Sequence, residues 1–276
     1  MVEVDKVRTH LARYGLTTKD PVPLTDARVL GLRVNSTEDG IHRWTRDGAL
    51  PIIGDAVTKR ELFSLFGKLI GHYPVAGWLR TACSYVKRLT NMIGWDDTVS
   101  EGPYSFAKEI LDRVQKQDPV TGVWQVPLDG AAEVWCDASN LAVACCLQVD
   151  GEVVEDAAWL RKENDGTHIN VAELEAVVKG LNLVLRWCIS KVEVVTDSAS
   201  VYNWVTSVLE DSHRPRVSGL SEMVIRRRLG IIAQLIEEYS MDVSVRLVPS
   251  AGNLADTLTR IPRSWIAKVV CDVRRY

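Results

Sequence analysis

The second half of this 276-residue sequence predicts an α/β fold, a mixed five-stranded sheet with flanking helices, and the first half predicts a mainly helical region. Three observations support this. In residues 132–160, apolar and polar residues alternate as in three short strands joined by tight turns. From residue 171 on, stretches with helical periodicity and two further strand-like apolar runs follow. Prolines and glycines interrupt residues 117–130. Antiparallel strands followed by strands that arrive through helical crossovers make a mixed sheet.

Helical periodicity dominates the first half. The stretch "TKRELFSLFGKLIG" opens with Thr58 and Glu61 at the spacing of a capping box, and its apolar residues recur on one helical face. The other elements expected here are a helix over 4–16, short strands over 28–34 and 42–48, and helices over 75–89 and 103–117.

The second half begins with strand periodicity. Asp150 and Gly151 separate two alternating runs and are typical of a tight hairpin turn. We therefore divide the chain into a region over 1–130, a domain over 131–262 and a C-terminal tail or linker over 263–276. The elements expected in the domain are strands over 132–139, 141–149 and 151–160, a helix over 171–187, a strand over 191–196, helices over 199–209 and 221–239, a strand over 242–249 and a short helix over 253–260.

Composition narrows the class of protein. Hydrophobic residues make up 46% of the sequence and charged residues 25%, as in an ordinary globular protein with a core. No apolar run approaches about 18 residues and "MVEVDKVRTH" lacks the apolar segment of a signal peptide, so we expect an intracellular, cytoplasmic protein without a membrane partner. None of the six cysteines forms a C-x-x-C pair, which favours buried reduced thiols over zinc ligands or disulfides. For the nine tryptophans, core anchoring is favoured over stacking on nucleic acid.

Charge is distributed unevenly along the chain. Residues 131–210 hold 5 Lys and Arg against 13 Asp and Glu, a net charge of −8, whereas residues 211–276 hold 11 against 7, a net charge of +4. Because like charges repel in a compact fold, the acids of the first range either spread over solvated surface or gather around something positive.

Two acids stand where strands end. Asp137 ends the first strand of the domain and Asp197 ends the fourth. Strand ends of an open α/β sheet gather at one edge, where sites form. A single aspartate there is also typical of a turn or a helix N-cap. Two carboxylates together raise each other's pKa unless a cation lies between them, so the pair favours a divalent metal ion.

The helix over 171–187 offers two further acids, of which one at most can face a given site. Glu173 and Glu175 lie about 200° apart around the helix. Glu175 falls on the solvent arc with Lys179 four residues on, which predicts a surface ion pair. Glu173 falls on the margin of the apolar face, without a cation three or four positions away, so we expect Glu173 to be the ligand.

The fourth acid, Asp256, lies off the apolar face of its segment. An ion pair with Arg260 would account for it if it stood alone. Together with Asp137, Glu173 and Asp197 it completes a set of hard oxygen ligands that suits Mg²⁺ or Mn²⁺ rather than zinc. Two such ions about 4 Å apart activate a water molecule and stabilise a leaving 3′ oxygen in phosphodiester hydrolysis. We therefore predict these four acids as metal ligands and catalytic residues.

At these residues the sequence resembles a known family. The pieces "VWCDAS", "HINVAELEAVV", "VEVVTDSASVYNW" and "LVPSAGNLADTLTR" resemble the type 1 ribonuclease H (RNase H) domain of retroviral and retrotransposon polyproteins, over about residues 131–262. The resemblance implies an RNase H-like sheet and two-metal, Mg²⁺-dependent cleavage of the RNA strand of an RNA–DNA hybrid. The family's histidine before the last aspartate aids product release; "PSAGN" lacks it, which bears on the rate of cleavage. The family's catalytic tetrad maps onto Asp137, Glu173, Asp197 and Asp256.

Residues 1–130 are similar to the end of a retrotransposon reverse transcriptase, from the region after the palm through the thumb and connection. "RVLGLRV", "HRW" and "TKRELFSLFGKLIGHYPVAGWLR" carry this similarity. The polymerase's Y-x-D-D hairpin is missing, and Asp96 and Asp97 follow a helix without a strand on either side, so we interpret them as loop residues. The resemblance implies that this chain does not polymerise by itself and works with the rest of a reverse transcriptase or polyprotein, a virus-like particle being one setting.

Contacts with the hybrid are also expected. By analogy with the family, Asn170 approaches the minor groove, where RNA is distinguished by its 2′-hydroxyls; a helix N-cap is the alternative. The stretch "IRRRL" predicts contact with phosphates through Arg226, Arg227 and Arg228; the alternative is a solvated helix face. For His168, just before the helix, capping or packing is favoured over metal binding because Mg²⁺ disfavours imidazole.

These observations predict an endonuclease, but two other functions were weighed. One is a non-catalytic module that binds or tethers the hybrid within a larger polymerase, or a retroelement fragment co-opted by a host. The other is an integrase or transposase of the same superfamily. Those enzymes place their glutamate after the second aspartate, whereas Glu173 lies between Asp137 and Asp197, so the integrase interpretation is disfavoured.

Overall fold

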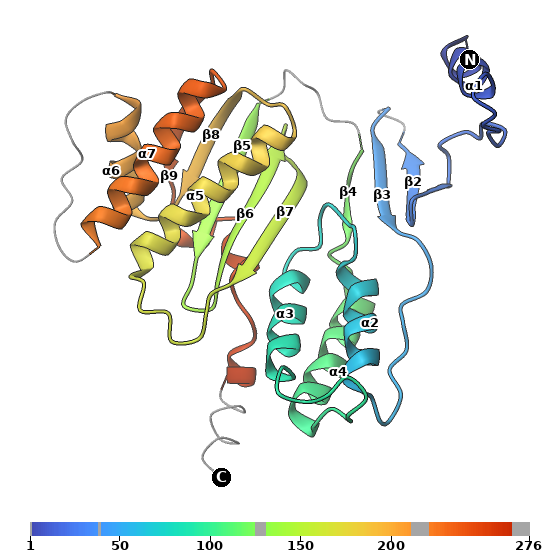
Figure 1. Cartoon of the computed structure of the whole chain (residues 1–276), viewed down its shortest axis with the longest axis horizontal. Helices are drawn as coiled ribbons and strands as arrows, with labels where there is room; N and C mark the ends of the chain where they lie inside the picture. Colours follow the sequence, from blue (N-terminus) through green and yellow to red (C-terminus); the bar gives the residue numbers. More distant parts are fainter. Residues whose placement is uncertain (1, 38–39, 125–130, 211–220, 267–276) are drawn as a thin grey trace.

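The computed structural model describes residues 2–37, 40–124, 131–210 and 221–266. Two apolar cores define two units: the first unit is built mainly from residues 27–124, and the second from residues 131–258. Figure 1 shows a five-stranded sheet with helices α5, α6 and α7 in one unit, and helices α2, α3 and α4 next to a smaller sheet in the other. Helix α1 (Val2–Ala12) lies at one end of the molecule. In the described part of the chain, no helix is long and apolar enough to cross a membrane.

The sheet of the second unit is mixed, as predicted. Its strand order is β7-β6-β5-β8-β9; β5, β6 and β7 pair antiparallel, whereas β8 pairs with β5 and β9 with β8 in parallel. The parallel strands arrive through helical crossovers, which confirms the α/β fold class. The elements are β5 (Ala132–Ala138), β6 (Ala142–Val149), β7 (Glu152–Leu160), α5 (Ile169–Arg186), β8 (Lys191–Thr196), α6 (Ala199–Leu209), α7 (Glu222–Glu238) and β9 (Asp242–Leu247).

Alternation along β5 decides which side chains are free to form a site. Val134 and Cys136 belong to the core beneath α5, whereas Trp135 belongs to a smaller apolar cluster, and by alternation Asp137 shares its face. Gly180 lets α5 approach this strand, because a Cβ there would lie 2.9 Å from Cys136 Sγ. Asp137 is therefore directed away from the core that α5 covers.

Two local predictions from turn chemistry and capping are confirmed. Asp150 and Gly151 adopt φ values of 49° and 83° and join β6 to β7 as a two-residue hairpin. At the start of α2, the Thr58 side chain accepts from the Glu61 backbone N–H and the Glu61 carboxylate accepts from the Thr58 backbone N–H. The capping box therefore fixes where this helix begins.

The first unit contains more strand than predicted. The stretch expected as one strand over 28–34 is a hairpin, because Leu30 and Gly31 adopt φ values of 51° and 78° and reverse the chain. A further strand lies within the segment expected as the boundary and pairs with β3, so the sheet has the order β1-β2-β3-β4. The elements are β1 (Ala27–Val29), β2 (Leu32–Ser36), β3 (His42–Arg46), α2 (Lys59–Ile70), α3 (Leu79–Leu89), α4 (Glu101–Lys116) and β4 (Thr121–Val123).

The end of the described chain also differs from expectation. The helix predicted over 253–260 is wrong in length: the segment contains only the short 3₁₀ turn η2 (Asp256–Leu258), and another such turn, η1 (Ser250–Gly252), precedes it. Trp265, expected in a tail, is 0% exposed and lies in the core of the first unit. Residues 267–276 of the expected tail lie outside the described residues. The segment that carries Asp256 therefore runs from one unit into the other.

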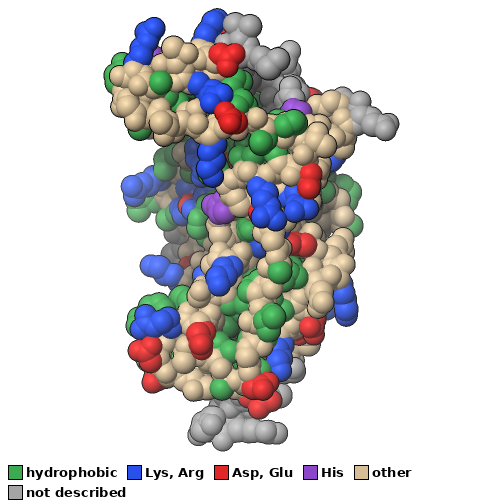
Figure 2. All heavy atoms as spheres, turned by 90° about the vertical axis from the view of Figure 1, so that its right-hand side faces the viewer, with side chains coloured by type: hydrophobic (Ala, Val, Ile, Leu, Met, Phe, Trp, Pro, Cys, Tyr) green, Lys and Arg blue, Asp and Glu red, His purple; other side chains and the backbone are tan. Residues whose placement is uncertain are grey.

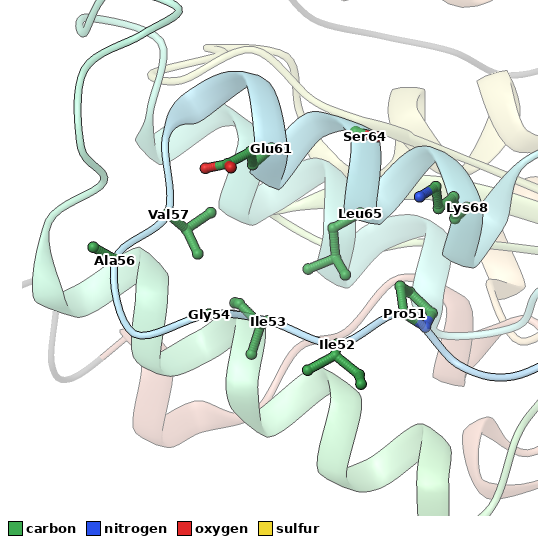
Figure 3. Close-up of a pocket in the computed structure, with 10 residues that line it drawn as sticks. All are labelled: Pro51, Ile52, Ile53, Gly54, Ala56, Val57, Glu61, Ser64, Leu65 and Lys68. Carbon is green, nitrogen blue, oxygen red and sulfur yellow. The ribbon is translucent and has the colours of Figure 1, made fainter.

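The surface of the molecule carries scattered charges, an acidic loop and a hollow. Figure 2 shows basic and acidic side chains interspersed over one face of the molecule. Asp96 and Asp97 are loop residues, as interpreted, and Asp96 pairs with Arg60. A hollow between α2 and the loop before it is drawn in Figure 3; it is lined by Pro51, Ile52, Ile53, Gly54, Ala56, Val57, Glu61, Ser64, Leu65 and Lys68.

The tryptophans and cysteines follow the predictions only in part. The cysteines that the structure describes are free thiols, as expected, although Cys188 is exposed; burial raises the pKa of the Cys83 thiol to about 12. Cys271 lies outside the described residues. Core anchoring holds for Trp44, Trp135 and Trp265, whereas Trp95, Trp124 and Trp159 are exposed.

Candidate active site

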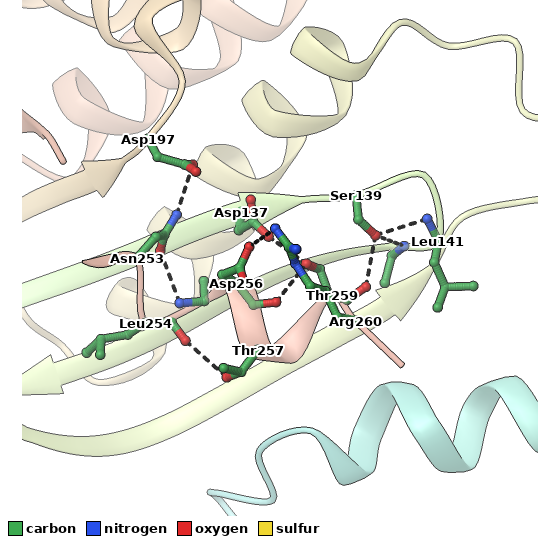
Figure 4. A network of polar contacts seen from close by, with 12 residues as sticks. Asp137, Ser139, Leu141, Asp197, Asn253, Leu254, Asp256, Thr257, Thr259 and Arg260 are labelled. Atoms are coloured by element: carbon green, nitrogen blue, oxygen red, sulfur yellow. Dashed lines mark hydrogen bonds and ion pairs between the residues drawn. The ribbon is translucent and has the colours of Figure 1, made fainter. Parts of the chain in front are cut away.

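The four predicted acids meet at one edge of the five-stranded sheet. Strands β5 and β8 are parallel neighbours, so Asp137 near the end of one and Asp197 just after the other lie at the same edge. Glu173 lies near the start of α5, and Asp256 begins η2. Figure 4 shows Asp137, Asp197 and Asp256 within one network of polar contacts. The sequence prediction that these strand ends converge is therefore correct.

Asp137 is the most enclosed of the four carboxylates. Asp137 is 6% exposed, and its Oδ2 accepts a hydrogen bond of 2.5 Å from Thr259 Oγ1. Burial raises the pKa of Asp137, and the nearby carboxylates of Asp197 and Asp256 raise it further, while the Thr259 hydroxyl counteracts the shift. The direction of this shift shows that burial and neighbouring charge outweigh the hydrogen bond.

Glu173 has the same electrostatic character. Burial raises its pKa, the carboxylates of Asp197 and Asp137 add to the shift, and the Ser198 side chain counteracts it. Its Oε2 is buried and has no hydrogen-bond partner among the described residues. A buried carboxylate oxygen without a partner is costly, so this oxygen of Glu173 is available to coordinate a cation.

A buried asparagine that sequence reasoning missed connects the parts of the site. Asn253 is 4% exposed, and its Nδ2 donates to Asp197 Oδ1 and to the Cys136 carbonyl, both at 3.0 Å. Its Oδ1 accepts from the Ala255 backbone N–H at 3.0 Å. One side chain thus ties the end of β5, the acid after β8 and the turn before Asp256. Its position in the quoted "AGNLAD" stretch was the available indication of its importance.

Asp256 has a cation of its own. Arg260 forms an ion pair with its carboxylate, as the alternative interpretation of this residue predicted; the Asp256 side chain is 23% exposed and that of Arg260 59%. Within the described residues, no three Asp, Glu, His or Cys side chains are arranged to hold one metal ion. Asp137, Asp197 and Asp256 each bond to a protein partner through one carboxylate oxygen, Oδ2 of Asp137 and Oδ1 of the other two.

The residues present nevertheless fit a divalent cation. They offer hard carboxylate oxygens, an orphaned oxygen on Glu173, and pKa values for Asp137 and Glu173 that burial and then neighbouring negative charge raise. These properties suit Mg²⁺ or Mn²⁺, which bind carboxylate oxygen in preference to imidazole or thiolate.

The predicted contacts with nucleic acid have local partners. Asn170 Nδ2 donates to Ser200 Oγ at 3.0 Å, and its own backbone N–H donates to Nδ1 of His168, which is the N-cap of α5. The capping role of His168 is confirmed, and the N-cap alternative for Asn170 is wrong.

The three arginines of α7 differ from one another. Arg226 pairs with Glu222 at 2.8 Å, Arg228 pairs with Glu175 at 2.7 Å, and Arg227 is exposed. Glu175 also pairs with Lys179 at 3.8 Å, as predicted. Phosphate contact by these arginines stays a prediction. The basic stretch "HRPR" at 213–216 lies outside the described residues.

Comparisons with known proteins agree with this architecture. Residues 128–225 match the model of a family described as reverse transcriptase-like. This part of the chain is therefore similar to a reverse transcriptase-like domain. Residues 58–116 match a domain of unknown function, DUF7047, which spans α2, α3 and α4. No curated protein matches the chain.

Solved structures extend the likeness to both units. A foamy viral protease-reverse transcriptase in complex with an RNA/DNA hybrid is 13% identical, with a TM-score of 0.60 over 86% of this chain and 30% of that chain. The foamy viral protease-reverse transcriptase dRH in complex with double-stranded DNA is 12% identical, with a TM-score of 0.56; the match covers 80% of this chain and 37% of that chain. An RNase H1 from the archaeon Halobacterium salinarum NRC-1 is 22% identical over 44% of this chain and 88% of its own, with a TM-score of 0.36. The chain spans about a third of the foamy viral proteins, and the likeness to them is one of fold. Together with the family match, it supports the resemblance to a reverse transcriptase and RNase H fragment.

Proposed function

We propose that this chain hydrolyses the RNA strand of RNA–DNA hybrids with a divalent metal ion, as part of a larger reverse transcriptase. The observation that carries the proposal is the convergence of four acids at the edge of the reverse transcriptase-like domain, with raised pKa values at Asp137 and Glu173. Acids with perturbed pKa values at the end of parallel strands are typical of a catalytic site.

The four acids would bind the metal. Asp137, Glu173, Asp197 and Asp256 would hold Mg²⁺ or Mn²⁺, and two ions supply an activated water and stabilise the leaving oxygen when bound. The other residues of the chain orient these ligands: the Thr259 hydroxyl fixes one Asp137 oxygen and the Asn253 amide fixes one Asp197 oxygen.

We also propose that cationic and amide side chains of α5 and α7 bind the hybrid. Asn170 lies one helical turn before Glu173 and would contact the RNA strand. Arg226, Arg227 and Arg228 would contact phosphates, with Arg227 the most available because the other two form ion pairs.

An assay with labelled RNA–DNA hybrid tests the proposal. Asp197→Asn should reduce Mg²⁺-dependent hydrolysis by more than about 100-fold, since even residues that only support a metal ligand are worth 10–100-fold. Asp96→Asn, which changes an exposed loop acid, is the matched control and should leave hydrolysis unchanged. EDTA should abolish cleavage, and single-stranded RNA and duplex DNA should not be cut. Full activity of Asp197→Asn, with unchanged circular dichroism, would reject the assignment.

A second candidate function is a module that binds or tethers the hybrid without cleaving it. The ion pair between Arg260 and Asp256 favours it, because a cation from the protein already occupies one of the four acids. The same assay separates the two functions. Binding of the hybrid without any cleavage in Mg²⁺ or Mn²⁺, and with equal affinity for Asp197→Asn, would establish the tethering function instead.

A further inference from the structure

The segment that carries Asp256 lacks the helix expected for it and is held by side chains from elsewhere. On the side of the sheet, Thr259 Oγ1 donates to Asp137, and Ser139 Oγ donates to the Thr259 carbonyl at 2.8 Å. These two bonds connect the turn η2 to the end of β5. They leave the opposite side of the segment to be supported by another element.

Helix α3 of the first unit supplies that support. Thr81, on this helix, is 1% exposed, and its Oγ1 donates to the carbonyl of Leu258, the residue that directly precedes Thr259. Figure 1 shows the end of the chain passing beside α3. Beyond the turn, Ile261 and Trp265 enter the core of the first unit. The acid-bearing segment is therefore enclosed between the sheet of one unit and α3 of the other.

Helix α3 is itself fixed against the sheet. Before the helix begins, the backbone N–H groups of Ala76 and Gly77 donate to the Asp156 carboxylate of β7 at 2.9 and 2.6 Å, and Arg80 forms an ion pair with the same carboxylate. Near its other end, Arg88 donates to the Arg161 carbonyl at 2.8 Å. Asp156 is 3% exposed, so this junction is part of the protein interior.

We propose that α3 is a structural part of the acid site and that Thr81 is a positioning residue for Asp256 and Thr259. The helical DUF7047 region then does more than connect: it supports the segment that carries Asp256. This inference rests on the proposed function only in experiments that measure hydrolysis. The positioning of the Asp256 segment can be measured without any hydrolysis assay.

Hydrogen exchange in the full chain tests the proposal. The backbone N–H groups of Asp256, Leu258 and Thr259 all donate within the turn and report on its order. Thr81→Val keeps the shape of the side chain but removes the donor, so these amides should exchange about fivefold faster, the factor expected for a hydrogen bond worth ~1 kcal/mol. Thr81→Ser should restore wild-type exchange. The matched control is Thr90→Val, another buried threonine near the end of α3, whose hydroxyl bonds to Lys87 of the same helix.

The outcomes separate this inference from the proposed function. Faster exchange at residues 256–259 in Thr81→Val, but not in Thr90→Val, supports the positioning role whether or not the wild-type chain cleaves hybrid. Equal exchange in the two variants would overturn it, even if wild-type hydrolysis is robust. Where the wild type is active, Thr81→Val should lower kcat several-fold with little change in KM for the hybrid, and Thr81→Ser should restore kcat.

Discussion

Replacing Trp265 by alanine should destabilise the first unit, although this residue lies near the opposite end of the chain. Its ring is 0% exposed and stacks on Phe106 at 4.7 Å between centroids and 16° between planes, and its Nε1 donates to Glu109 Oε2 at 2.6 Å. Burial of roughly 200 Å² of aromatic surface is worth ~5 kcal/mol, and truncations of this kind cost about 3–5 kcal/mol. We expect Trp265→Ala to lower the free energy of unfolding by about 4 kcal/mol. Trp265→Phe should cost about 1–2 kcal/mol, because it keeps the stacking and loses the hydrogen bond.

Urea unfolding of the full chain, followed by circular dichroism, measures this effect. Trp159→Ala is the matched control, because that residue is 40% exposed and the Lys179 ammonium lies 4.3 Å from its ring centroid. An exposed cation–π contact of this kind is worth about 0.5–1 kcal/mol. A loss for Trp265→Ala no greater than that for Trp159→Ala would refute the conclusion that the chain after Asp256 is anchored in the first unit.

Two predictions concern charge at the site. Arg260→Gln should lower the Mg²⁺ concentration for half-maximal hydrolysis several-fold, because Asp256 loses a competing cation; an increased Mg²⁺ requirement would contradict this. The second prediction follows from burial, which raises the pKa values of Asp137 and Glu173 in the folded state. The stability that these two groups contribute is fully present below their ordinary pKa values of 3.8 and 4.5, and it is lost as pH rises through their folded-state pKa values. In EDTA, the Asp137→Asn/Glu173→Gln double variant should therefore melt above the wild type at pH 7 and lose this advantage towards pH 4; a difference independent of pH would show that ionisation is not its cause.

The fold could be predicted where periodicity and local chemistry act together. The sheet of the second unit and its hairpin at Asp150 follow from alternation and turn residues that need no distant partner. The hairpin at Leu30 was missed because a leucine at positive φ carries no sequence pattern; the turn is set by the strands on either side. Strand β4 has three residues and exists through its pairing with β3, so tertiary contact rather than propensity decides it.

In the candidate site, too, some residues could be predicted from the sequence and others could not. The acids were predictable because strand order brings Asp137 and Asp197 to one edge, and because helical angle selects Glu173 over Glu175. The residues that orient them were not, since Thr259 meets Asp137 across 122 positions of sequence and Asn253 meets the Cys136 carbonyl across 117. Such hydrogen bonds depend on how separate elements approach one another. The helix expected around Asp256 failed for a related reason: contacts with Thr81 and Ser139 hold the segment in short turns.

The balance of charge at the site favours catalysis over tethering. Of the described cations, Arg260 forms an ion pair with one of the four acids, whereas Asp137, Glu173 and Asp197 form none within the described residues. If Asp137 and Asp197 had a purely structural role, neutral amide side chains in their place would serve equally well. Such amides would keep the hydrogen bonds from Thr259 and Asn253 without the cost of buried negative charge. Retaining ionisable groups at a cost to stability is typical of residues that a bound cation and substrate will engage. Tethering would also leave the orphaned oxygen of Glu173 without a purpose, since phosphate groups repel a carboxylate. A divalent cation bound by the acids would account for both the buried charge and the unpaired oxygen.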